Sequence, residues 1–473
     1  MKFSQVFEIQ RMPEDDWFDP ILSVDTQLFI DPFLLYDSEA GLFVGSHEQV
    51  IRFFSEAYKL IAQSAGNTSS QRYRKALTIL LFPEAQELCL GYASTGTRGF
   101  GSGKGFAKII AAAVWEAIRA GVDEITHFEE VGIFREGIGA DRTSDITACL
   151  LRKRLADYTL EVCLRHNVPT QVVNFRNGIF DPESVRWQSI SVRLPINSFT
   201  GKPILLVPRY YLRDLPTINA DDFWDFCYTN DNETLRNEFN FDISKRVTKA
   251  NIVEVARRHP DLRSRYLEEV EKQQGMPYDM YADPKGYVQW YEASLDYCTS
   301  HSLPLAFVSS TDFNDSIYSM VGAYKHFIEQ NGGWQLLWND HGPSKGEKAA
   351  QLLFLGIVSH YCRANNIDVS PEPNIGRGPV DFKMSQGYQF RTLLEVKLAR
   401  NTKFWNGLNK QLPTYLEAEQ VHDGYFIVVI FNEADVERTK EIGKLASKLN
   451  NDTGYNITPV VVDARPKISA SKL

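Results

Sequence analysis

Two short stretches, GPVD at residues 378–381 and EVK at residues 395–397, decide the C-terminal part of this chain. They lie in two runs, residues 380–384 and 390–398, whose apolar and β-branched content predicts neighbouring strands. Gly387 lies between the runs and supplies the positive φ that a tight turn needs. We therefore expect a hairpin that places the two stretches on adjacent strands.

Three charged side chains of this hairpin, Asp381, Glu395 and Lys397, are expected to gather on one face. Side chains alternate faces along a strand, so Glu395 and Lys397 point the same way while Val396 points into the core. Strand pairing brings Asp381 near Glu395, and two carboxylates that close repel each other unless a divalent cation joins them. A neighbouring lysine can hold a water or stabilise negative charge that develops on a phosphate. The combination predicts metal-dependent hydrolysis of phosphodiester bonds.

The region from about residue 344 to about residue 463 resembles the PD-(D/E)xK nuclease superfamily, whose core has the element order αβββαβ. The pattern of apolar residues predicts the other elements of that order, namely helices at residues 344–363, 405–421 and 433–450 and strands at residues 425–431 and 457–462. The resemblance implies a restriction-endonuclease-like core at the C-terminus of an α/β (α+β) protein.

The resemblance also implies roles for single residues. Asp381 and Glu395, together with the backbone carbonyl of Val396, are expected to bind Mg²⁺ or Mn²⁺. Glu347 lies where many family members carry a helical acid that reaches the metal. Lys397 is expected to orient or activate the attacking water.

Three further residues are candidates for binding the substrate. Gln411 and Tyr415 match the Q-x-x-x-Y motif of the RecB-type subgroup, and their i, i+4 spacing places both on one helix face. Pro413 lies between them and departs from the motif's usual context, since a proline inside a helix predicts a kink or a late helix start. Arg377 lies in a glycine-flanked loop, where it either approaches a phosphate or is a solvated loop arginine.

Composition limits the class of protein. The chain has 473 residues, of which 43% are hydrophobic, so two or three domains with real cores are expected. It contains no apolar run of eighteen residues and no signal-peptide core, which argues against a membrane protein. Its six cysteines are scattered without a C-x-x-C pair, which favours reduced thiols in a cytoplasmic protein over a zinc ribbon or an iron–sulfur cluster.

Charge is unevenly distributed along the chain. The net charge is −9, but residues 341–473 carry 17 Lys and Arg against 14 Asp and Glu, so the remainder carries −12. The mildly basic C-terminal part is expected to bind nucleic acid, with DNA preferred. The acidic N-terminal part repels nucleic acid and is expected to bind a protein partner or a second copy of the chain.

The sequence predicts three segments. Residues 1–240 form a mixed α/β domain for sensing or assembly, residues 241–335 a mainly helical connector, and residues 336–473 the nuclease domain. In the first segment we expect strands at residues 28–30, 76–82, 87–92 and 203–207 and helices at residues 46–62, 106–120 and 144–165. In the second we expect helices at residues 249–274, 287–298 and 314–330.

Two N-terminal stretches are candidates for a second site. Residues 96–105 contain five glycines and two cations before a helix, which favours either an anion site or a flexible surface loop. They lack the glycine and Ser/Thr positions of a P-loop. Asp141, Arg142 and Asp145 lie in a second glycine-containing stretch, where Asp145 is expected to cap a helix and the other two are left open.

Together these observations favour a Mg²⁺-dependent DNA endonuclease, rather than an exonuclease, with an N-terminal sensing or assembly domain. Its layout resembles that of effectors in prokaryotic antiviral defence, which is an analogy from architecture. A restriction or repair endonuclease, a catalytically inert nucleic-acid-binding subunit, and a nucleotide-sensing enzyme that uses residues 96–105 are the alternatives.

Overall fold

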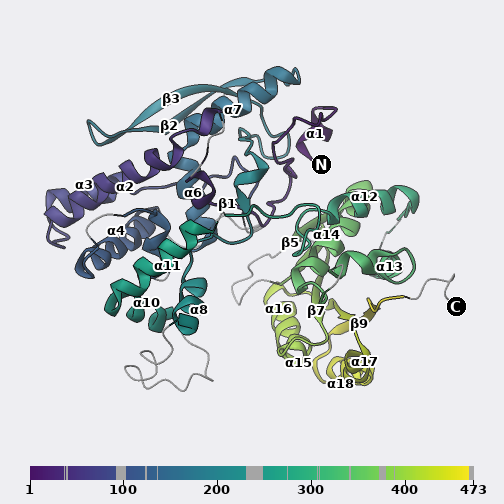
Figure 1. Ribbon diagram of the computed structural model, residues 1–473. Helices are drawn as coiled ribbons and strands as arrows, with labels where there is room; N and C mark the ends of the chain where they lie inside the picture. The colour runs from purple at the N-terminus through teal and green to yellow at the C-terminus, as the bar shows by residue number, and fades with distance from the viewer. Residues whose placement is uncertain are drawn as a thin grey trace. The chain divides into compact units, whose positions relative to one another are not determined.

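The computed structural model describes residues 1–36, 38, 41–91, 103–122, 125–135, 137–230, 249–273, 275–305, 307, 309–339, 342–371, 380–387 and 389–467. These residues form two compact units, unit 1 up to Tyr278 and unit 2 from Asp279 onward. Each unit combines helices with small sheets, so the α/β class predicted from the sequence is confirmed (Figure 1). The segment predicted as a connector contributes its earlier helices to unit 1 and its later helices to unit 2.

Unit 1 is mainly helical and carries two short antiparallel sheets. Its strands are β1 (Phe29–Ile30) paired with β4 (Leu212–Arg213), and β2 (Gln171–Asp181) paired with β3 (Arg186–Leu194). Its described helices are α1 (Phe3–Val6), α2 (Ser46–Gln63), α3 (Gln71–Ile79), α4 (Gly103–Arg119), α5 (Val131–Phe134), α6 (Ala140–Leu150), α7 (Arg152–Arg165), α8 (Ala220–Asn230), α10 (Lys249–Arg258) and α11 (Pro260–Lys272). The helices predicted at residues 46–62 and 106–120 and the strand predicted at residues 28–30 are confirmed within two or three residues.

The strand predicted at residues 76–82 is wrong, because its first half belongs to helix α3. Ser70 caps that helix by accepting a hydrogen bond from the N–H of Tyr73 at 3.0 Å. The buried residues Tyr73, Ala76 and Ile79 recur every three positions, which is the spacing of one helix face. The helix therefore continues into the apolar run that suggested a strand.

The strands predicted at residues 87–92 and 203–207 are also not found. Among the described residues of these ranges, each contributes one isolated bridge, at Leu90 and at Pro203, and no ladder. The last residue of the first range lies outside the described residues. The first segment instead contains a turn, and Cys89 has a positive φ of 52°. Both segments contribute buried apolar side chains to unit 1, which explains their apolar composition without a sheet.

Unit 1 contains a long hairpin, β2–β3, that the sequence did not predict. Most of its side chains are exposed or half-buried, and Val172 is 62% exposed, so the hairpin has no continuous apolar run. Its register shifts between Phe175 and Ile179. Gly178 lies in this shift, and a Cβ there would fall 2.1 Å from Ile190 Cγ1, so the close approach requires glycine.

Unit 2 is built on one five-stranded mixed sheet. The strands β5 (Asp368–Pro371), β6 (Phe382–Gln386), β7 (Phe390–Leu398), β8 (Asp423–Ile430) and β9 (Asn456–Asp463) lie in sequence order. β5, β6 and β7 pair antiparallel, whereas β7, β8 and β9 pair parallel. β8 is buried along almost its whole length, as its continuous apolar sequence predicts.

Helices cover both faces of this sheet (Figure 1). On one face, α14 (Glu347–Ala364) contacts β6 through Phe354 and Phe382, whose ring centroids lie 5.0 Å apart. On the other face, α16 (Leu412–Glu419) packs Leu412 and Leu416 into one core cluster with Phe426 of β8. The remaining helices are α12 (Trp290–Ser300), α13 (Ser310–Gln330), α15 (Phe404–Asn406), α17 (Glu433–Thr439) and α18 (Ile442–Thr453). The predicted order of one helix, three strands, a helical segment and a strand is therefore confirmed.

The helix predicted at residues 405–421 is interrupted. A π-helical turn at Gly407–Gln411 separates α15 from α16. Pro413 lies in the first turn of α16, directly after the π turn. Of the two outcomes that the proline predicts, a late helix start is not found, because the helical segment already begins at Phe404; the regular α-helix is instead disturbed by the π turn next to the proline.

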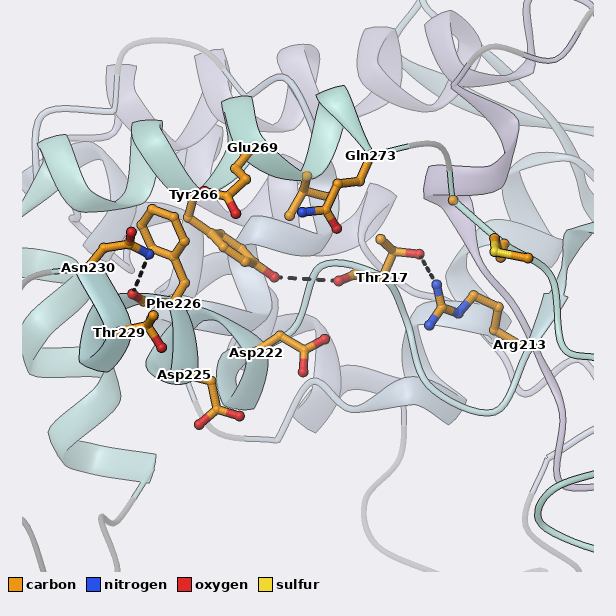
Figure 2. Close-up of a pocket in the computed structure, with 13 residues that line it drawn as sticks. Arg213, Thr217, Asp222, Asp225, Phe226, Thr229, Asn230, Tyr266, Glu269 and Gln273 are labelled. Atoms are coloured by element: carbon orange, nitrogen blue, oxygen red, sulfur yellow. Dashed lines mark hydrogen bonds between the residues drawn. The ribbon is translucent and has the colours of Figure 1, made fainter. Parts of the chain in front are cut away.

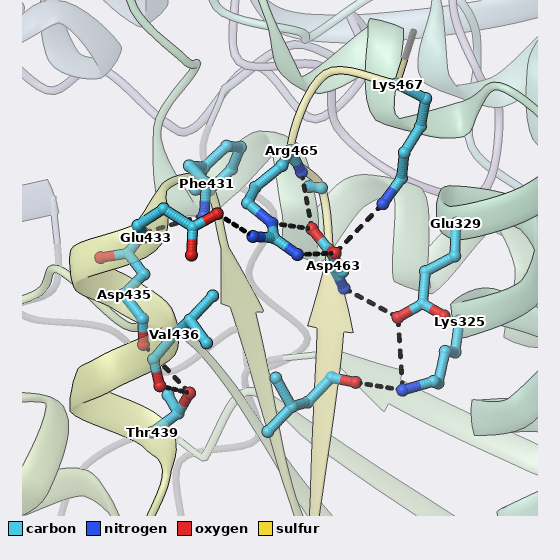
Figure 3. Close-up of polar contacts among 12 residues, drawn as sticks. Lys325, Glu329, Phe431, Glu433, Asp435, Val436, Thr439, Asp463, Arg465 and Lys467 are labelled. Carbon is cyan, nitrogen blue, oxygen red and sulfur yellow. Dashed lines mark hydrogen bonds and ion pairs between the residues drawn. The ribbon is translucent and has the colours of Figure 1, made fainter. Parts of the chain in front are cut away.

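A polar network joins three elements at the carboxyl end of β9 (Figure 3). Asp463 accepts hydrogen bonds from the backbone and guanidinium of Arg465 and an ion pair from Lys467 at 3.1 Å. Arg465 also pairs with Glu433 at the start of α17, and the N–H of Asp463 donates to Glu329 of α13 at 2.8 Å. Burial raises the pKa of Asp463, but the hydrogen bonds from Arg465 outweigh it and lower the pKa well below its usual range. The network anchors α13 and α17 to the edge strand.

Among the described residues, no helix is both long and apolar enough to cross a membrane. All six cysteines carry free thiols, and five of them are buried.

Candidate active site

Asp381 and Glu395 lie opposite each other, as the hairpin pairing predicts. β6 begins directly after Asp381, at Phe382, and Phe382 pairs with Leu394. The N–H of Asp381 lies 3.4 Å from Oε2 of Glu395, and the N–H of Val396 donates to Oδ2 of Asp381 at 2.7 Å. Backbone amides therefore hold both carboxylates on the same side of the strand pair.

The ammonium of Lys397 lies among three carboxylates. Its Nζ is 3.0 Å from Oε1 of Glu347, 3.1 Å from Oε1 of Glu395 and 3.5 Å from Oδ2 of Asp381. The Lys397 side chain is 10% exposed and the Glu395 side chain 3% exposed. The structure thus brings together, around one buried cation, the four charged residues that the sequence singled out.

Burial and the neighbouring charges shift the pKa values of the groups in this cluster. Burial raises the pKa of Glu395, and the neighbouring Asp381 raises it further, to about 8. Burial also raises the pKa of Asp381, although Lys397 and the N–H of Val396 oppose that rise. For Lys397, burial lowers the pKa, but the three carboxylates outweigh it and raise the pKa above its usual range. When its carboxyls are ionised, the cluster carries more negative than positive charge, and a bound cation would offset the excess.

Helix α14 contributes two side chains to the cluster, one of which the sequence analysis missed. Glu347 is the first residue of α14 and reaches Lys397 from the helix N-terminus. Gln351 lies one turn later and hydrogen-bonds the Asp381 carboxylate, which lowers the pKa of Asp381. The i, i+4 spacing from Glu347 was a usable signal for Gln351.

A second residue that the sequence analysis missed, Asn401, lies in the turn after β7. Its Nδ2 donates to Oε2 of Glu347 at 2.8 Å, and the N–H of Leu398 lies 3.3 Å from the same oxygen. No sequence pattern marked Asn401, because nothing in a loop sequence tells which side chain turns back toward a helix.

Gln411 and Tyr415 both lie at the helical segment that follows β7. Tyr415 is 6% exposed, and its pKa is raised first by burial and then by Glu395 and Asp381, which places its ring in the field of the cluster. Oε1 of Gln411 is buried and has no hydrogen-bond partner among the described residues. An unpaired buried amide oxygen in the π turn is an available acceptor.

Two candidates fall on parts of the chain outside the described residues. They are Arg377 and most of the glycine-rich stretch, residues 96–102. Residues 103–105 are described and form the first turn of α4.

The capping role predicted for Asp145 is wrong. Helix α6 begins at Ala140, with Gly139 at its N-cap, so Asp145 lies in the second turn. Its Oδ1 instead accepts the N–H of Ala85 at 2.9 Å, and its other oxygen lies 3.7 Å from the guanidinium of Arg142. Burial raises the pKa of Asp145 to about 7.

The donor set suits a hard divalent cation bound by few protein ligands. Asp381 and Glu395 supply carboxylate oxygens, which Mg²⁺ prefers, and Mg²⁺ usually uses one or two carboxylates and completes its shell with water and phosphate oxygens. Within the part of the chain that the structure describes, no group of three or more His, Cys, Asp or Glu side chains is arranged to hold a metal ion. The carboxylates converge on Lys397 instead. Asp381 and Glu395 are therefore the side chains here that could hold Mg²⁺ or Mn²⁺, and the described residues do not form a closed protein cage around such an ion.

Unit 1 carries a separate cavity of about 550 Å³ between α8 and α11 (Figure 2). Its polar and aromatic lining comes mainly from Arg213, Thr217, Asp222, Asp225, Phe226, Tyr266 and Glu269. Arg213 donates to Oγ1 of Thr217 at 2.9 Å and lies 3.9 Å from the buried carboxylate of Asp31. The volume is in the range of small-molecule sites. The sequence analysis singled out no residue of this cavity.

Two family models match the chain, both described as a domain of unknown function. Residues 8–219 match the model Domain of unknown function (DUF8370), which lies within unit 1. Residues 313–433 match the model Domain of unknown function (DUF8371), which runs from α13 to the start of α17 and includes the whole Lys397 cluster. No curated protein matches the chain. No solved structure matches it either.

Proposed function

We propose that unit 2 is a metal-dependent nuclease that hydrolyses phosphodiester bonds in DNA. The observation that carries this proposal is the convergence of Asp381, Glu395 and Glu347 on the ammonium of Lys397, at 3.0 to 3.5 Å. A buried cluster with surplus negative charge is costly for the fold, and a divalent cation and a phosphate are the ligands that its charges complement.

The residues take separate roles in this proposal. Asp381 and Glu395, with the carbonyl of Val396, would hold Mg²⁺ or Mn²⁺. The cation, when bound, would polarise the scissile phosphate and lower the pKa of a bound water. Lys397 would hold the attacking water or a phosphate oxygen, and Glu347 would keep the ammonium in place and support the metal.

The substrate strand would approach along the helical segment after β7. Tyr415 is held near the carboxylates, and the unpaired Oε1 of Gln411 can accept a hydrogen bond from the substrate or its water. Unit 1 would serve as a sensing or assembly domain that restrains cleavage, as in an effector of antiviral defence. This last step rests on the two-unit layout and on the acidic charge of the N-terminal part.

The test is cleavage of supercoiled plasmid, linear duplex, single-stranded DNA and RNA by the full chain with Mg²⁺ or Mn²⁺. Lys397→Ala should abolish cleavage. The matched control is Lys383→Ala, because Lys383 lies on the paired strand β6 and, within the described part of the chain, forms one ion pair, with Glu419 at 2.5 Å. Its cleavage should stay near that of the wild type.

Metal-dependent cleavage that Lys397→Ala removes and Lys383→Ala retains would support the proposal and identify the substrate. Equal cleavage by both variants would point to a contaminating nuclease and contradict it. If the wild type cuts none of the substrates, even with lysate from phage-infected cells added as an activator, a catalytically inert subunit becomes the better explanation.

A further inference from the structure

We propose that Asn401 is a positioning residue of the candidate active site, which fixes the carboxylate of Glu347 and through it the ammonium of Lys397. Its catalytic consequence rests on the proposed nuclease function. The contact itself does not, because it joins two side chains of this chain directly.

Both ends of the Asn401 amide are used, so its orientation is fixed. Nδ2 donates to Oε2 of Glu347 at 2.8 Å, while Oδ1 accepts the N–H of Lys403 at 2.9 Å. An amide that was turned over would place its oxygen against the Glu347 carboxylate and its NH₂ against the Lys403 N–H. Both contacts would then become repulsive.

The backbone around Asn401 is anchored independently of Glu347. The N–H of Asn401 donates to the carbonyl of Leu398 at 2.9 Å, and its own carbonyl accepts from the N–H of Phe404 and the guanidinium of Arg438, each at 3.1 Å. Arg438 also packs over the ring of Phe404, 5.3 Å from its centroid. Asn401 is therefore the fixed partner, and Glu347 is the group that is held.

The adjacent residue ties the same turn to the start of α14. The guanidinium of Arg400 donates to the carbonyls of Ser344 and Lys345, at 3.4 and 2.9 Å. The turn after β7 thus contacts α14 twice, at the backbone before the helix through Arg400 and at its first residue through Asn401.

The two carboxylate oxygens of Glu347 therefore have different partners. Oε2 is occupied by Asn401 and by the N–H of Leu398, so Oε1 is directed to Lys397 at 3.0 Å. The Glu347 side chain is 24% exposed and has several rotatable bonds, so without Asn401 it would turn toward water. Lys397 would then keep only Asp381 and Glu395 and would shift toward them.

The test uses the isosteric variant Asn401→Asp, which replaces the donor by a carboxylate facing Glu347. Its partner is the swap Asn401→Asp with Glu347→Gln, which removes the like-charge contact and restores a donor opposite position 401, at the cost of the bond that Glu347 accepts from the N–H of Leu398. Thr402→Ala, at an exposed position of the same turn, is the matched control. All variants are made in the full chain, and thermal unfolding is measured in EDTA, where neither metal nor cleavage contributes.

In EDTA we expect Asn401→Asp to lower the Tm of unit 2 by roughly 3–6 °C, since a part-buried hydrogen bond becomes a like-charge contact. The swap should recover at least half of that loss. Thr402→Ala should leave the Tm unchanged. If the swap is as unstable as Asn401→Asp, or if the single variant melts like the wild type, Asn401 does not hold Glu347 and the inference is overturned.

Kinetics then separate positioning from simple support of the fold. Under conditions where all variants are folded, Asn401→Asp should lower kcat by about 10- to 100-fold with KM within twofold, the range typical of residues that orient a ligand of an active site. Unchanged kcat alongside Lys397-dependent cleavage would overturn the positioning role and leave the proposed function intact. If the Tm values change as expected but the wild type cuts none of the substrates, the contact between Asn401 and Glu347 would be supported and the proposed function contradicted.

Discussion

Lys397→Met should destabilise unit 2 far more than loss of an ordinary lysine. The ammonium of Lys397 contacts three carboxylates at 3.0, 3.1 and 3.5 Å and is 10% exposed. Methionine keeps much of the length and apolar volume of the stem but leaves these carboxylates without their cation. Removing one partner of a buried charge cluster costs about 3–5 kcal/mol, whereas exposed or half-exposed pairs are worth about 1 kcal/mol or less.

The stability lost in Lys397→Met should depend on pH, and the pKa of Glu395 determines the direction of that dependence. The pKa of Glu395 is raised to about 8 by burial and by Asp381, above its ordinary value of 4.5. A carboxyl with a raised pKa binds its proton more tightly in the folded protein, so its contribution to stability is lost as the pH rises through that window. Lys397→Met raises these pKa values further. We therefore expect the full loss of about 3–5 kcal/mol above pH 8 and a smaller loss near pH 5, where the carboxyl of Glu395 is protonated.

Native-state hydrogen exchange in EDTA measures this for unit 2 alone, through the buried amides of β7 and β8. Lys383→Met is the control, because Lys383 has one carboxylate partner among the residues that the structure describes and a side chain that is 23% exposed. Exchange from β8 should accelerate strongly in Lys397→Met at pH 8 and only slightly in the control, after correction for the intrinsic pH dependence of exchange. Equal effects in the two variants, or a loss that does not change with pH, would refute the reasoning that Lys397 balances the cluster.

Two further predictions concern packing and charge elsewhere. Burial raises the pKa of Asp145 to about 7, so this carboxyl lowers the free energy of unfolding as the pH rises from about 4 to 7. Asp145→Asn should therefore raise the free energy of unfolding by about 2–4 kcal/mol at pH 8 and leave it unchanged at pH 4. If urea titrations of wild type and variant give parallel curves of stability against pH, this prediction is wrong. A Cβ at Gly356 in α14 would lie 2.2 Å from Oγ of Ser294, so Gly356→Ala should destabilise the protein by about 1–3 kcal/mol in thermal unfolding. At Gly443 in α18 a Cβ would have nothing within 4 Å, so Gly443→Ala should stabilise the protein by up to about 1 kcal/mol in the same assay.

Local pattern was enough to predict most elements of unit 2. Residues 390–398 were predicted as a strand, and β7 has the same bounds, because a run of high apolar content that follows turn residues is a strong signal. The pairing of Asp381 with Glu395 followed from the hairpin alone, since register on a two-residue period fixes which side chains face each other. The disturbance of the regular helix next to Pro413 followed from the fixed backbone of that proline.

The same reasoning failed where apolar content had more than one explanation. The apolar run at residues 76–82 fits either a strand or the end of a helix. Ser70 caps a helix that continues into this run, so the helix forms. The β2–β3 hairpin was missed for the opposite reason, because its outer face is polar and no apolar run marked it.

The arrangement around Lys397 depends on contacts between residues far apart in the chain. Glu347 and Lys397 are fifty residues apart, and Asn401 and Glu347 fifty-four, so no local spacing relates their side chains. Sequence identified which residues have the chemistry to bind a cation and a phosphate. Only the packing of α14 against the end of β7 set which oxygen of Glu347 meets the ammonium and brought Gln351 and Asn401 into the cluster. Burial then made those contacts strong, since charges and hydrogen bonds that are excluded from water must satisfy one another.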